Sequence, residues 1–314
     1  MQSTERKGGV TVDVSCLCNC MTAEQKEQFD QEGYLVVPDA LDDEILGRLL
    51  EAGDRVDREE RKKRGIDPGA LMAKFRTIVE DDVFLELLDW PKTFPLIWDI
   101  LGWNVQHYIS HLIYYPPEAK GSVDLRPGGW HQDGGRPVPE MERPQPRLSL
   151  KVAFWLTDVS ESENGGTYLI PGSHKRDRPP ERNPGGLYEG AIQGKGKAGT
   201  AVLFDRRMWH ARGMNTSDIT RKVLFLGYSY RWLRGLDYNV IPEEILAKCD
   251  PIRRQMLGDG VDVKGWWQPT DADVPLKTWL EEQKGEDYVK GIGEKQWERW
   301  GEEADQRQVT NDDG

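Results

Sequence analysis

The chain has few of the residues that hold metals and disulfides, with only four cysteines and five histidines among 314 residues. Cys16, Cys18 and Cys20 share the short segment CLCNC, and Cys249 stands far from them. Tetrahedral zinc sites usually use C-x-x-C pairs with two further ligands nearby, so the alternate spacing here suits them poorly. Reduced thiols on a flexible leader, residues 1–20, are therefore favoured over a thiolate metal site.

Long apolar runs and an excess of positive charge are also missing. No stretch approaches the roughly 20 apolar residues of a membrane span, and the opening MQSTERKGGVTVD lacks the apolar core of a secretory signal. Lys and Arg number 42 against 54 Asp and Glu, which gives a formal net charge of −12. Negative charge opposes binding to nucleic acid and to anionic membranes. We therefore expect a cytoplasmic protein that binds neither.

Apolar residues are present in sufficient number for one large domain or at most two, at 37% of the chain. Thr22 and Gln25 form a capping-box pattern that predicts a helix over 23–32, ended by Gly33. A short β-rich run, residues 34–37, follows. Asp42 or Asp43 then begins a second helix, and a third helical segment covers about 82–101.

Short β-type runs separated by Gly, Pro and Asn dominate from residue 105 to 232. The expected strands are Val105 to Tyr115, Leu148 to Leu156, Gly166 to Ile170, Thr200 to Phe204 and Lys222 to Trp232. This pattern favours an antiparallel sandwich or barrel with the helices packed outside it.

Two long loops and a tail complete the chain. The loops, residues 134–147 and 174–197, are rich in Pro and Gly, which is more typical of lids or pocket walls than of simple connectors. Residues 236–314 are expected to form a partly mobile helical extension. Past Gly285 we expect contacts only through Trp297 and Trp300.

The stretch GGWHQDGG, residues 128–135, carries a histidine and an aspartate two residues apart. In a strand, His131 and Asp133 would point to the same side. An H-x-D pair alone is more often an ordinary turn than a metal site. His210, which follows the β-type run TAVLF, supplies a third candidate ligand. Two imidazoles and one carboxylate on one side of a metal are typical of non-haem Fe(II) oxygenases.

Arg221 strengthens this interpretation. Alternation along RKVLFLGYSYRW places Arg221 on the same face as Val223 and Phe225. A guanidinium inside a barrel needs an anionic partner, because burying an unpaired charge is costly. A dicarboxylate whose other end chelates the iron would be such a partner.

Several motifs in order resemble the phytanoyl-CoA dioxygenase family of Fe(II)- and 2-oxoglutarate-dependent oxygenases. They are H-x-D at 131–133, Trp155 followed by Asn164-Gly165-Gly166, PGSHK at 171–175, W-H-x-x-G-x-N-T-S at 209–217, and Arg221. The segment TAEQKEQFDQEGYLVVPDAL is similar to the start of that family. The resemblance covers about residues 21–232.

The resemblance implies a mainly β fold with flanking helices, namely a double-stranded β-helix (jelly-roll, cupin-like) barrel within residues 21–235. Helices are expected over 23–101 and the barrel over 105–232. The resemblance implies that His131, Asp133 and His210 bind the iron. It implies that Arg221 binds the distal carboxylate of 2-oxoglutarate. Positions beside this cosubstrate are implied for Trp155, His111 and Lys74.

The implied reaction uses Fe(II), 2-oxoglutarate and O2 to hydroxylate an unactivated carbon of a small-molecule metabolite, such as a carboxylate, an acyl-CoA or a natural-product intermediate. Succinate and CO2 are released. Halogenases of this iron class have a small residue where Asp133 stands, so oxygenation, desaturation, epimerisation or cyclisation is favoured. A zinc-dependent hydrolase or isomerase on a cupin-like barrel remains an alternative, although it gives Arg221 no role, as does a non-catalytic metal-binding module.

Other polar residues have ordinary structural interpretations. His174 is expected in a turn and His107 in a strand near the junction of helices and barrel. Lys151 alternates onto the face of Trp155 and would meet a substrate carboxylate or lie at the open rim. The many arginines near the site either attract an anionic substrate or pair with neighbouring acids. The arginines are Arg136, Arg143, Arg147, Arg176, Arg178, Arg182, Arg206, Arg207 and Arg212. The acids are Glu140, Glu142, Asp177 and Glu181.

Overall fold

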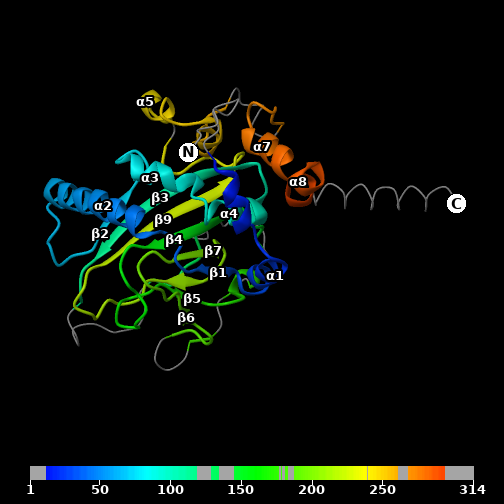
Figure 1. Ribbon diagram of the computed structural model, residues 1–314. Coiled ribbons are helices and arrows are strands. Elements are labelled where there is room, and N and C mark those ends of the chain that lie inside the picture. Colours follow the sequence, from blue (N-terminus) through cyan, green and yellow to red (C-terminus); the bar gives the residue numbers. More distant parts are fainter. Residues whose placement is uncertain are drawn as a thin grey trace.

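A six-stranded antiparallel sheet, in the order β1-β7-β4-β9-β3-β2, runs through the middle of the computed structural model (Figure 1). A three-stranded sheet, in the order β6-β5-β8, lies against one face of it. The strands are β1 (Tyr34–Val37), β2 (Met72–Phe75), β3 (Val105–Tyr115), β4 (Ser149–Trp155), β5 (Tyr168–Leu169), β6 (Ile192–Gln193), β7 (Ala201–Asp205), β8 (His210–Ala211) and β9 (Arg221–Tyr230). The structure describes residues 12–118, 129–133, 145–176, 178, 181–182, 187–238, 240–260 and 268–293.

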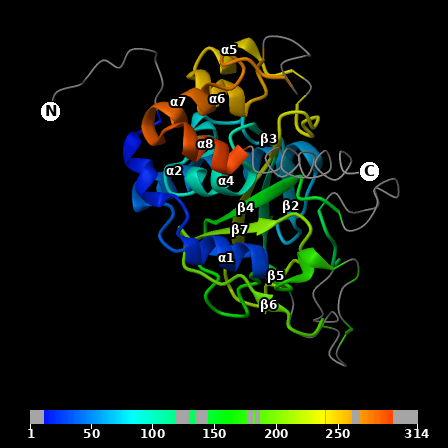
Figure 2. The same cartoon turned by 90° about the vertical axis from the view of Figure 1, so that its right-hand side faces the viewer.

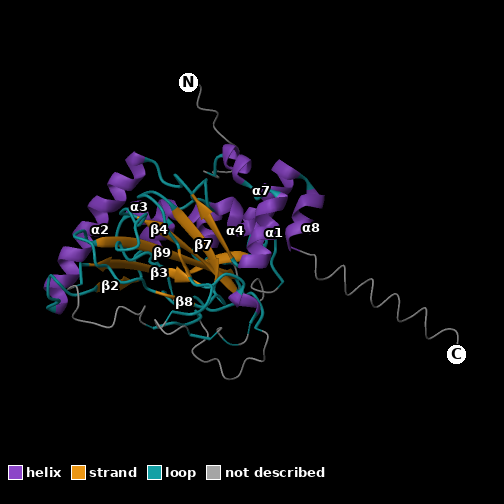
Figure 3. Ribbon diagram, turned by 90° about the horizontal axis from the view of Figure 1, so that it is seen from below, coloured by secondary structure: helices purple, strands orange, loops and turns teal. Residues whose placement is uncertain are grey.

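Helices cover the other face of the large sheet. They are α1 (Ala23–Glu32), α2 (Asp43–Arg64), α3 (Asp82–Glu86), α4 (Phe94–Leu101), α5 (Glu243–Leu246), α6 (Pro251–Met256), α7 (Pro275–Lys284) and α8 (Glu286–Gly293), with 3₁₀ turns at Val14–Asn19, Leu87–Asp89 and Ser173–Lys175. Figure 2 shows α4, α7 and α8 above the large sheet and β5 and β6 beyond its opposite side. Figure 3 shows α2 and α3 at one end of this helical layer and α7 and α8 at the other.

The helix boundaries follow local capping chemistry. Thr22 and Gln25 form both hydrogen bonds of the capping box, and Gly33 ends α1 with φ 84°. The side chain of Asp42 accepts from the N–H of Ile45 and begins α2. These predicted helix limits are confirmed.

Two apolar cores separate the layers. The larger one lies between the helices and the large sheet and includes Leu49, Trp98 and Leu226. The smaller one lies on the sheet's other face and includes Trp155, Phe204, Val223, Phe225 and, from the small sheet, Leu169. Two facing antiparallel sheets with an outer helical layer confirm the predicted double-stranded β-helix. Among the described residues no helix is long and apolar enough to span a membrane.

Three segments differ from expectation. In the interval 23–101, expected to be helical around the β-type run 34–37, that run is confirmed as β1, which pairs with β7, but β2 is an additional strand that pairs with β3. Within the expected flexible leader, residues 14–19 form a 3₁₀ turn with Cys16 buried in the larger core. Burial raises the pKa of Cys16 to about 12, which disfavours the thiolate that a metal would need.

The C-terminal extension is also more firmly packed than expected. The hydroxyl of Tyr288 in α8 accepts a hydrogen bond from Trp98 Nε1 at 3.0 Å and donates one to Asp99 at 2.7 Å. Val289 is 1% exposed. Helix α8 is therefore anchored on α4. The predicted contacts of Trp297 and Trp300 lie outside the described residues.

Candidate metal centre and cosubstrate pocket

Backbone pairing brings the three predicted ligands together. His131 forms an isolated antiparallel bridge with His210 at the start of β8, through N–H to carbonyl bonds of 3.0 and 2.9 Å. The N–H of Asp133 donates to the carbonyl of Arg206 at 2.9 Å. These bonds fix the turn that carries His131 and Asp133 against the segment that leads into His210, although the two segments are far apart in sequence.

The side chains converge on one small volume. His131 Nε2 lies 3.7 Å from Asp133 Oδ1, and His210 Nε2 lies 3.5 Å from Asp133 Oδ2. One ligand atom from each residue can be chosen so that all three lie within 4.8 Å of one another, and no other such group of three His, Cys, Asp or Glu residues occurs among the described residues. The geometry is that of a single-ion site.

Hydrogen bonds set the tautomer of both imidazoles. His131 Nδ1 lies 2.6 Å from the carbonyl of Gly129, and His210 Nδ1 lies 2.9 Å from that of Met208. A carbonyl only accepts, so each Nδ1 carries the proton and each Nε2 turns a lone pair toward Asp133. Burial lowers the pKa of His210 to about 4 despite the nearby Asp133, which keeps this imidazole neutral. Metal ligation needs neutral histidines.

Asp133 is held ionised by a neighbour that the sequence did not reveal as its partner. Burial alone would raise the pKa of Asp133, but the positive charge of Lys151, joined at low pH by that of protonated His210, outweighs it and lowers this pKa to about 2. Lys151 Nζ lies 2.7 Å from Asp133 Oδ2. Lys151 therefore neither lies at an open rim nor awaits a substrate carboxylate, because Asp133 is its partner. Two imidazoles and one carboxylate form a donor set that fits a ferrous ion.

Arg221 lies in a pocket suited to a carboxylate. It is 3% exposed at the start of β9, between the rings of Trp155 and Tyr115, whose centroids are 5.7 and 5.9 Å from its Cζ. Its Nη1 donates to the carbonyl of Gly165, and its Nε is buried without a partner among the described residues. Burial, with the charge of Arg212, lowers the pKa of Arg221 to about 10, so the guanidinium is still cationic near neutral pH.

The walls of this pocket were only partly predictable. Trp155 is fully buried with no hydrogen-bond partner for Nε1 among the described residues. Tyr115 was not singled out, although it pairs directly with Arg221 in the β3–β9 register. Arg212, over the Tyr115 ring at 4.3 Å, pairs with Glu118 at 3.3 Å and closes the same end of the sheet.

The two weaker predictions of cosubstrate residues, His111 and Lys74, have different outcomes. His111 of β3 stacks on Phe75, with ring centroids 4.0 Å apart, and lies 6.2 Å from Phe225 on the side of the metal ligands. Lys74 faces α2 instead, where its Nζ lies 3.2 Å from Glu60 and 2.9 Å from Glu80. The structure thus brings His111, but not Lys74, to the site. Successive residues of β2 point to opposite faces, and the register puts Lys74 on the helical side.

The other two histidines have structural surroundings. His107 Nε2 lies 3.6 Å from Asp237, and His174 Nε2 lies 3.1 Å from the carbonyl of Asp30. His107 is in β3 and His174 in a 3₁₀ turn, as predicted.

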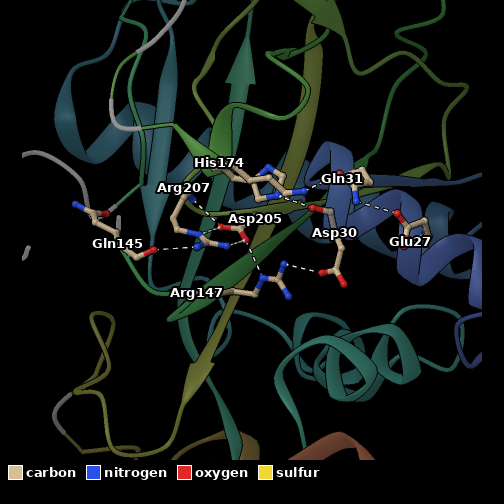
Figure 4. Close-up of polar contacts among 9 residues, drawn as sticks. Glu27, Asp30, Gln31, Gln145, Arg147, His174, Asp205 and Arg207 are labelled. Carbon is tan, nitrogen blue, oxygen red and sulfur yellow. Dashed lines mark hydrogen bonds and ion pairs between the residues drawn. The ribbon is translucent and has the colours of Figure 1, made fainter. Parts of the chain in front are cut away.

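Several of the arginines are engaged by acids other than those expected. Asp205, at the end of β7, accepts from Arg147 at 2.9 Å and from both Nε and Nη2 of Arg207 at 2.9 and 2.7 Å (Figure 4). Arg147 also reaches Asp30 of α1 at 3.0 Å. The expected partners Glu140, Glu142 and Asp177, with Arg136 and Arg143, lie outside the described residues. This network fixes the strand end from which the chain continues to His210.

A cavity of about 560 Å³ lies beside this region but contains none of the metal-site residues. Its wall includes His107, Tyr108, Trp232 and Asp237. Tyr108 connects the cavity with the groups around Asp133, because the charge of Asp133 contributes to the pKa of Tyr108. The cavity is therefore a neighbour of the metal centre and not the centre itself.

A double-stranded β-helix with two histidines and one carboxylate on one side of a site defines the class of non-haem Fe(II)- and 2-oxoglutarate-dependent oxygenases. The family model of phytanoyl-CoA dioxygenase (PhyH) matches residues 29–223, more than half of the chain. The chain belongs to this family, and its cofactors are Fe(II) and 2-oxoglutarate.

Individual relatives are distant. An uncharacterized protein of Mycobacterium bovis is 26% identical over 233 residues, 72% of this chain and 82% of its own length. The ectoine dioxygenase of Bordetella parapertussis is 26% identical over 241 residues, which cover 67% of this chain and 76% of that enzyme. The crystal structure of HygX from Streptomyces hygroscopicus with nickel and 2-oxoglutarate superposes with a TM-score of 0.54 at 16% identity, covering 69% and 90%. The last likeness supports the fold alone.

Proposed function

We propose that this dioxygenase hydroxylates an unactivated carbon of a small-molecule metabolite, with His131, Asp133 and His210 holding Fe(II) and Arg221 binding the distal carboxylate of 2-oxoglutarate. The observation that carries the proposal is the convergence of the three ligand atoms within 4.8 Å on the same sheet face as the buried Arg221. When bound, iron and 2-oxoglutarate together supply the oxidising power, with succinate and CO2 as products. A cytoplasmic location remains part of this proposal.

The three ligands act by fixed orientation. Carbonyl groups hold each Nδ1, so His131 and His210 present Nε2 to the metal in a fixed orientation. Asp133 is ionised well below neutral pH. Three protein ligands leave further positions for the cosubstrate and O2.

Arg221 binds the distal carboxylate of 2-oxoglutarate and takes no part in the reaction itself. Its cation is surrounded by Trp155 and Tyr115, which exclude water and strengthen a charge-assisted bond to a carboxylate. Binding that carboxylate also satisfies Nε, which is otherwise buried without a partner among the described residues. The arginine therefore favours a cosubstrate with a second carboxylate over a monocarboxylate keto acid.

Asp133 supports oxygenation over halogenation, because halogenases of this class lack the carboxylate ligand. Desaturation, epimerisation and cyclisation would use the same site, and the substrate decides among them. Trp155, Val223 and Phe225 make the adjoining core apolar, which shields reactive species from water.

Anaerobic titration of the purified protein with Fe(II) and 2-oxoglutarate tests the proposal. The wild type should develop the weak visible charge-transfer band of the chelate, and the Asp133→Ala variant should show neither this band nor succinate release. A zinc hydrolase or an empty barrel would give no band. Succinate formation by folded Asp133→Ala at the wild-type rate would refute the ligand assignment.

A further inference from the structure

Arg206 is a buried arginine that forms no ion pair with any of the described residues. The residue is 8% exposed, and its Nε and Nη2 are both buried without a hydrogen-bond partner among the described residues. Its sequence neighbour Arg207 is also largely buried but binds Asp205 with both of these atoms, at 2.9 and 2.7 Å. Burying a cation without such a partner is costly, so the difference between the two arginines calls for a ligand.

The two neighbouring arginines lie in different surroundings. Asp205 lies opposite Leu150 on the helical side of the sheet, where Arg147 and Arg207 reach it. Arg206 comes next, and its N–H bonds to the carbonyl of Ser149 at 3.4 Å. Arg206 lies in the turn after β7, where its carbonyl accepts a hydrogen bond from the N–H of Asp133 at 2.9 Å, so this turn lies against the metal centre.

The surroundings of Arg206 belong to the metal centre. The hydroxyl of Tyr108 lies 3.3 Å from Ser149 Oγ, and the Arg206 guanidinium lies within electrostatic range of Tyr108, Asp205 and Asp133. Two residues along β4 from Ser149, Lys151 already has Asp133 as its partner at 2.7 Å. Lys151 therefore already has a partner, whereas Arg206 beside this site forms no ion pair with a described residue.

The free edge of Arg206 has the shape of a carboxylate site. Nε–H and one Nη2–H point in parallel, which matches the two oxygens of a planar carboxylate. Arg207 uses this edge for Asp205, and Arg253 directs the same Nε and Nη2 to Asp89 at 3.2 and 2.7 Å. A neutral amide would leave the charge uncompensated, because it offers one acceptor and no negative charge.

Arg221 does not account for the same anion. Arg206 lies beside Ser149 at one end of β4, whereas Arg221 lies over Trp155 at the other end. At about 3.3 Å per residue, the strand separates these ends by roughly 20 Å. Because Arg221 is directed to Gly165 and Tyr115 at its own end, one 2-oxoglutarate molecule does not occupy both guanidinium groups.

We propose that Arg206 binds a carboxylate of the primary substrate, so that the enzyme acts on a small organic acid whose reacting carbon lies near Asp133 and the metal. Tyr108 and Phe225 border this region and suit an apolar body behind the carboxylate. This inference rests on the proposed function, because it assigns the substrate class of the same site.

The test uses the full chain, held anaerobically with Fe(II) and saturating 2-oxoglutarate so that Arg221 is already occupied. The probes are acetate, hexanoate and phenylacetate, each paired with its primary amide, and methylphosphonate as a different anion. Binding is followed by the shift in Tm and by perturbation of the charge-transfer band. The variants are Arg206→Gln, Arg206→Lys and, as a matched loss of one exposed charge far away on α2, Arg58→Gln.

We expect at least one acid to bind wild type and Arg58→Gln better than its amide and better than methylphosphonate. Arg206→Gln should weaken that acid roughly tenfold or more, and Arg206→Lys should restore part of the affinity without the bidentate fork. Without probes, Arg206→Gln should keep the band and have a Tm equal to or above that of wild type, because it removes an uncompensated buried charge. A purely structural arginine would give a lower Tm.

The failures are distinguishable. A wild type without the charge-transfer band would count against the proposed function and against this inference with it. An intact band would overturn the inference alone if no acid binds, if acid and amide bind equally, if methylphosphonate binds best, or if Arg206→Gln binds the acid as tightly as wild type.

Discussion

The ammonium of Lys151 lies 2.7 Å from Asp133 Oδ2, so a metal ligand is also one half of a buried ion pair. Lys151 stands in the middle of β4 opposite Gly227, and Asp133 lies in the turn after His131. The pair joins the large sheet to the segment that carries two of the three ligands. It restrains the carboxylate before any metal arrives.

Replacing Lys151 by Met should lower Fe(II) affinity by roughly 10–100-fold, because groups that orient metal ligands are typically worth this much. Asp133 would lose its restraint and would compete less well with protons, since the lysine charge helps to keep its pKa low. Fe(II) dissociation constants from competition with a chromogenic chelator measure the effect, with Lys222→Met, at the exposed Asp54, as the matched lysine control. Tighter iron binding by Lys151→Met would show that the lysine acts mainly by repelling the metal.

Substitution of Arg221 should separate cosubstrate binding from iron binding. Arg221→Met removes a charge-assisted bond worth about 1.5–3 kcal/mol, which corresponds to roughly a 10–100-fold rise in the KM for 2-oxoglutarate. Arg221→Lys should recover little, because an ammonium cannot replace a guanidinium fork between Trp155 and Tyr115. Iron affinity without 2-oxoglutarate should stay within twofold of wild type. An unchanged KM would remove Arg221 from the cosubstrate site.

Much of this site was accessible from the sequence because its residues sit in ordered motifs. The H-x-D pair, His210 and Arg221 were recognisable by their order along the chain, although His131 and Asp133 lie in a bridge and a turn and not in the expected strand. Helix limits at Thr22 and Gly33 were predictable because capping is local chemistry.

What could not be predicted depends on long-range register. Lys74 and Phe75 are adjacent, yet only pairing of β2 with β3 decides that Phe75 reaches His111 while Lys74 faces α2. The partners of Lys151 and Tyr288, likewise, come from distant segments. No spacing within one segment encodes such contacts, and a four-residue strand such as MAKF carries too little alternation to be distinguished from a loop.

His111 should make the metal-free protein sensitive to acid. Burial, helped by the charge of Lys151, lowers the pKa of His111 to about 4, whereas an unfolded histidine titrates near 6.5. The unfolded chain therefore binds the proton first, and the stabilising effect, fully present above about pH 6.5, is lost as the pH falls toward 4. Between pH 7 and pH 5, the free energy of unfolding measured with urea should fall by roughly 1–2 kcal/mol less for His111→Phe than for wild type. Equal losses would mean that the ring is already protonated or freely solvated.

A glycine in β9 makes room for the aromatic ring next to the proposed substrate carboxylate. A Cβ at Gly227 would lie 2.6 Å from the Tyr108 ring and 2.5 Å from Ile109, so Gly227→Ala must displace Tyr108 or the strand. We expect a loss of about 1–3 kcal/mol in the free energy of unfolding, as for other overpacked sites, and a larger change in substrate KM than in the KM for 2-oxoglutarate. Gly47→Ala is the matched control, because a Cβ there meets no atom within 4 Å on α2 and should stabilise the helix by about 0.5–1 kcal/mol. Urea unfolding and steady-state kinetics of both variants measure these effects. Equal stability of the two alanine variants would show that the Tyr108 ring is free to move, and an unchanged substrate KM would place it away from the substrate.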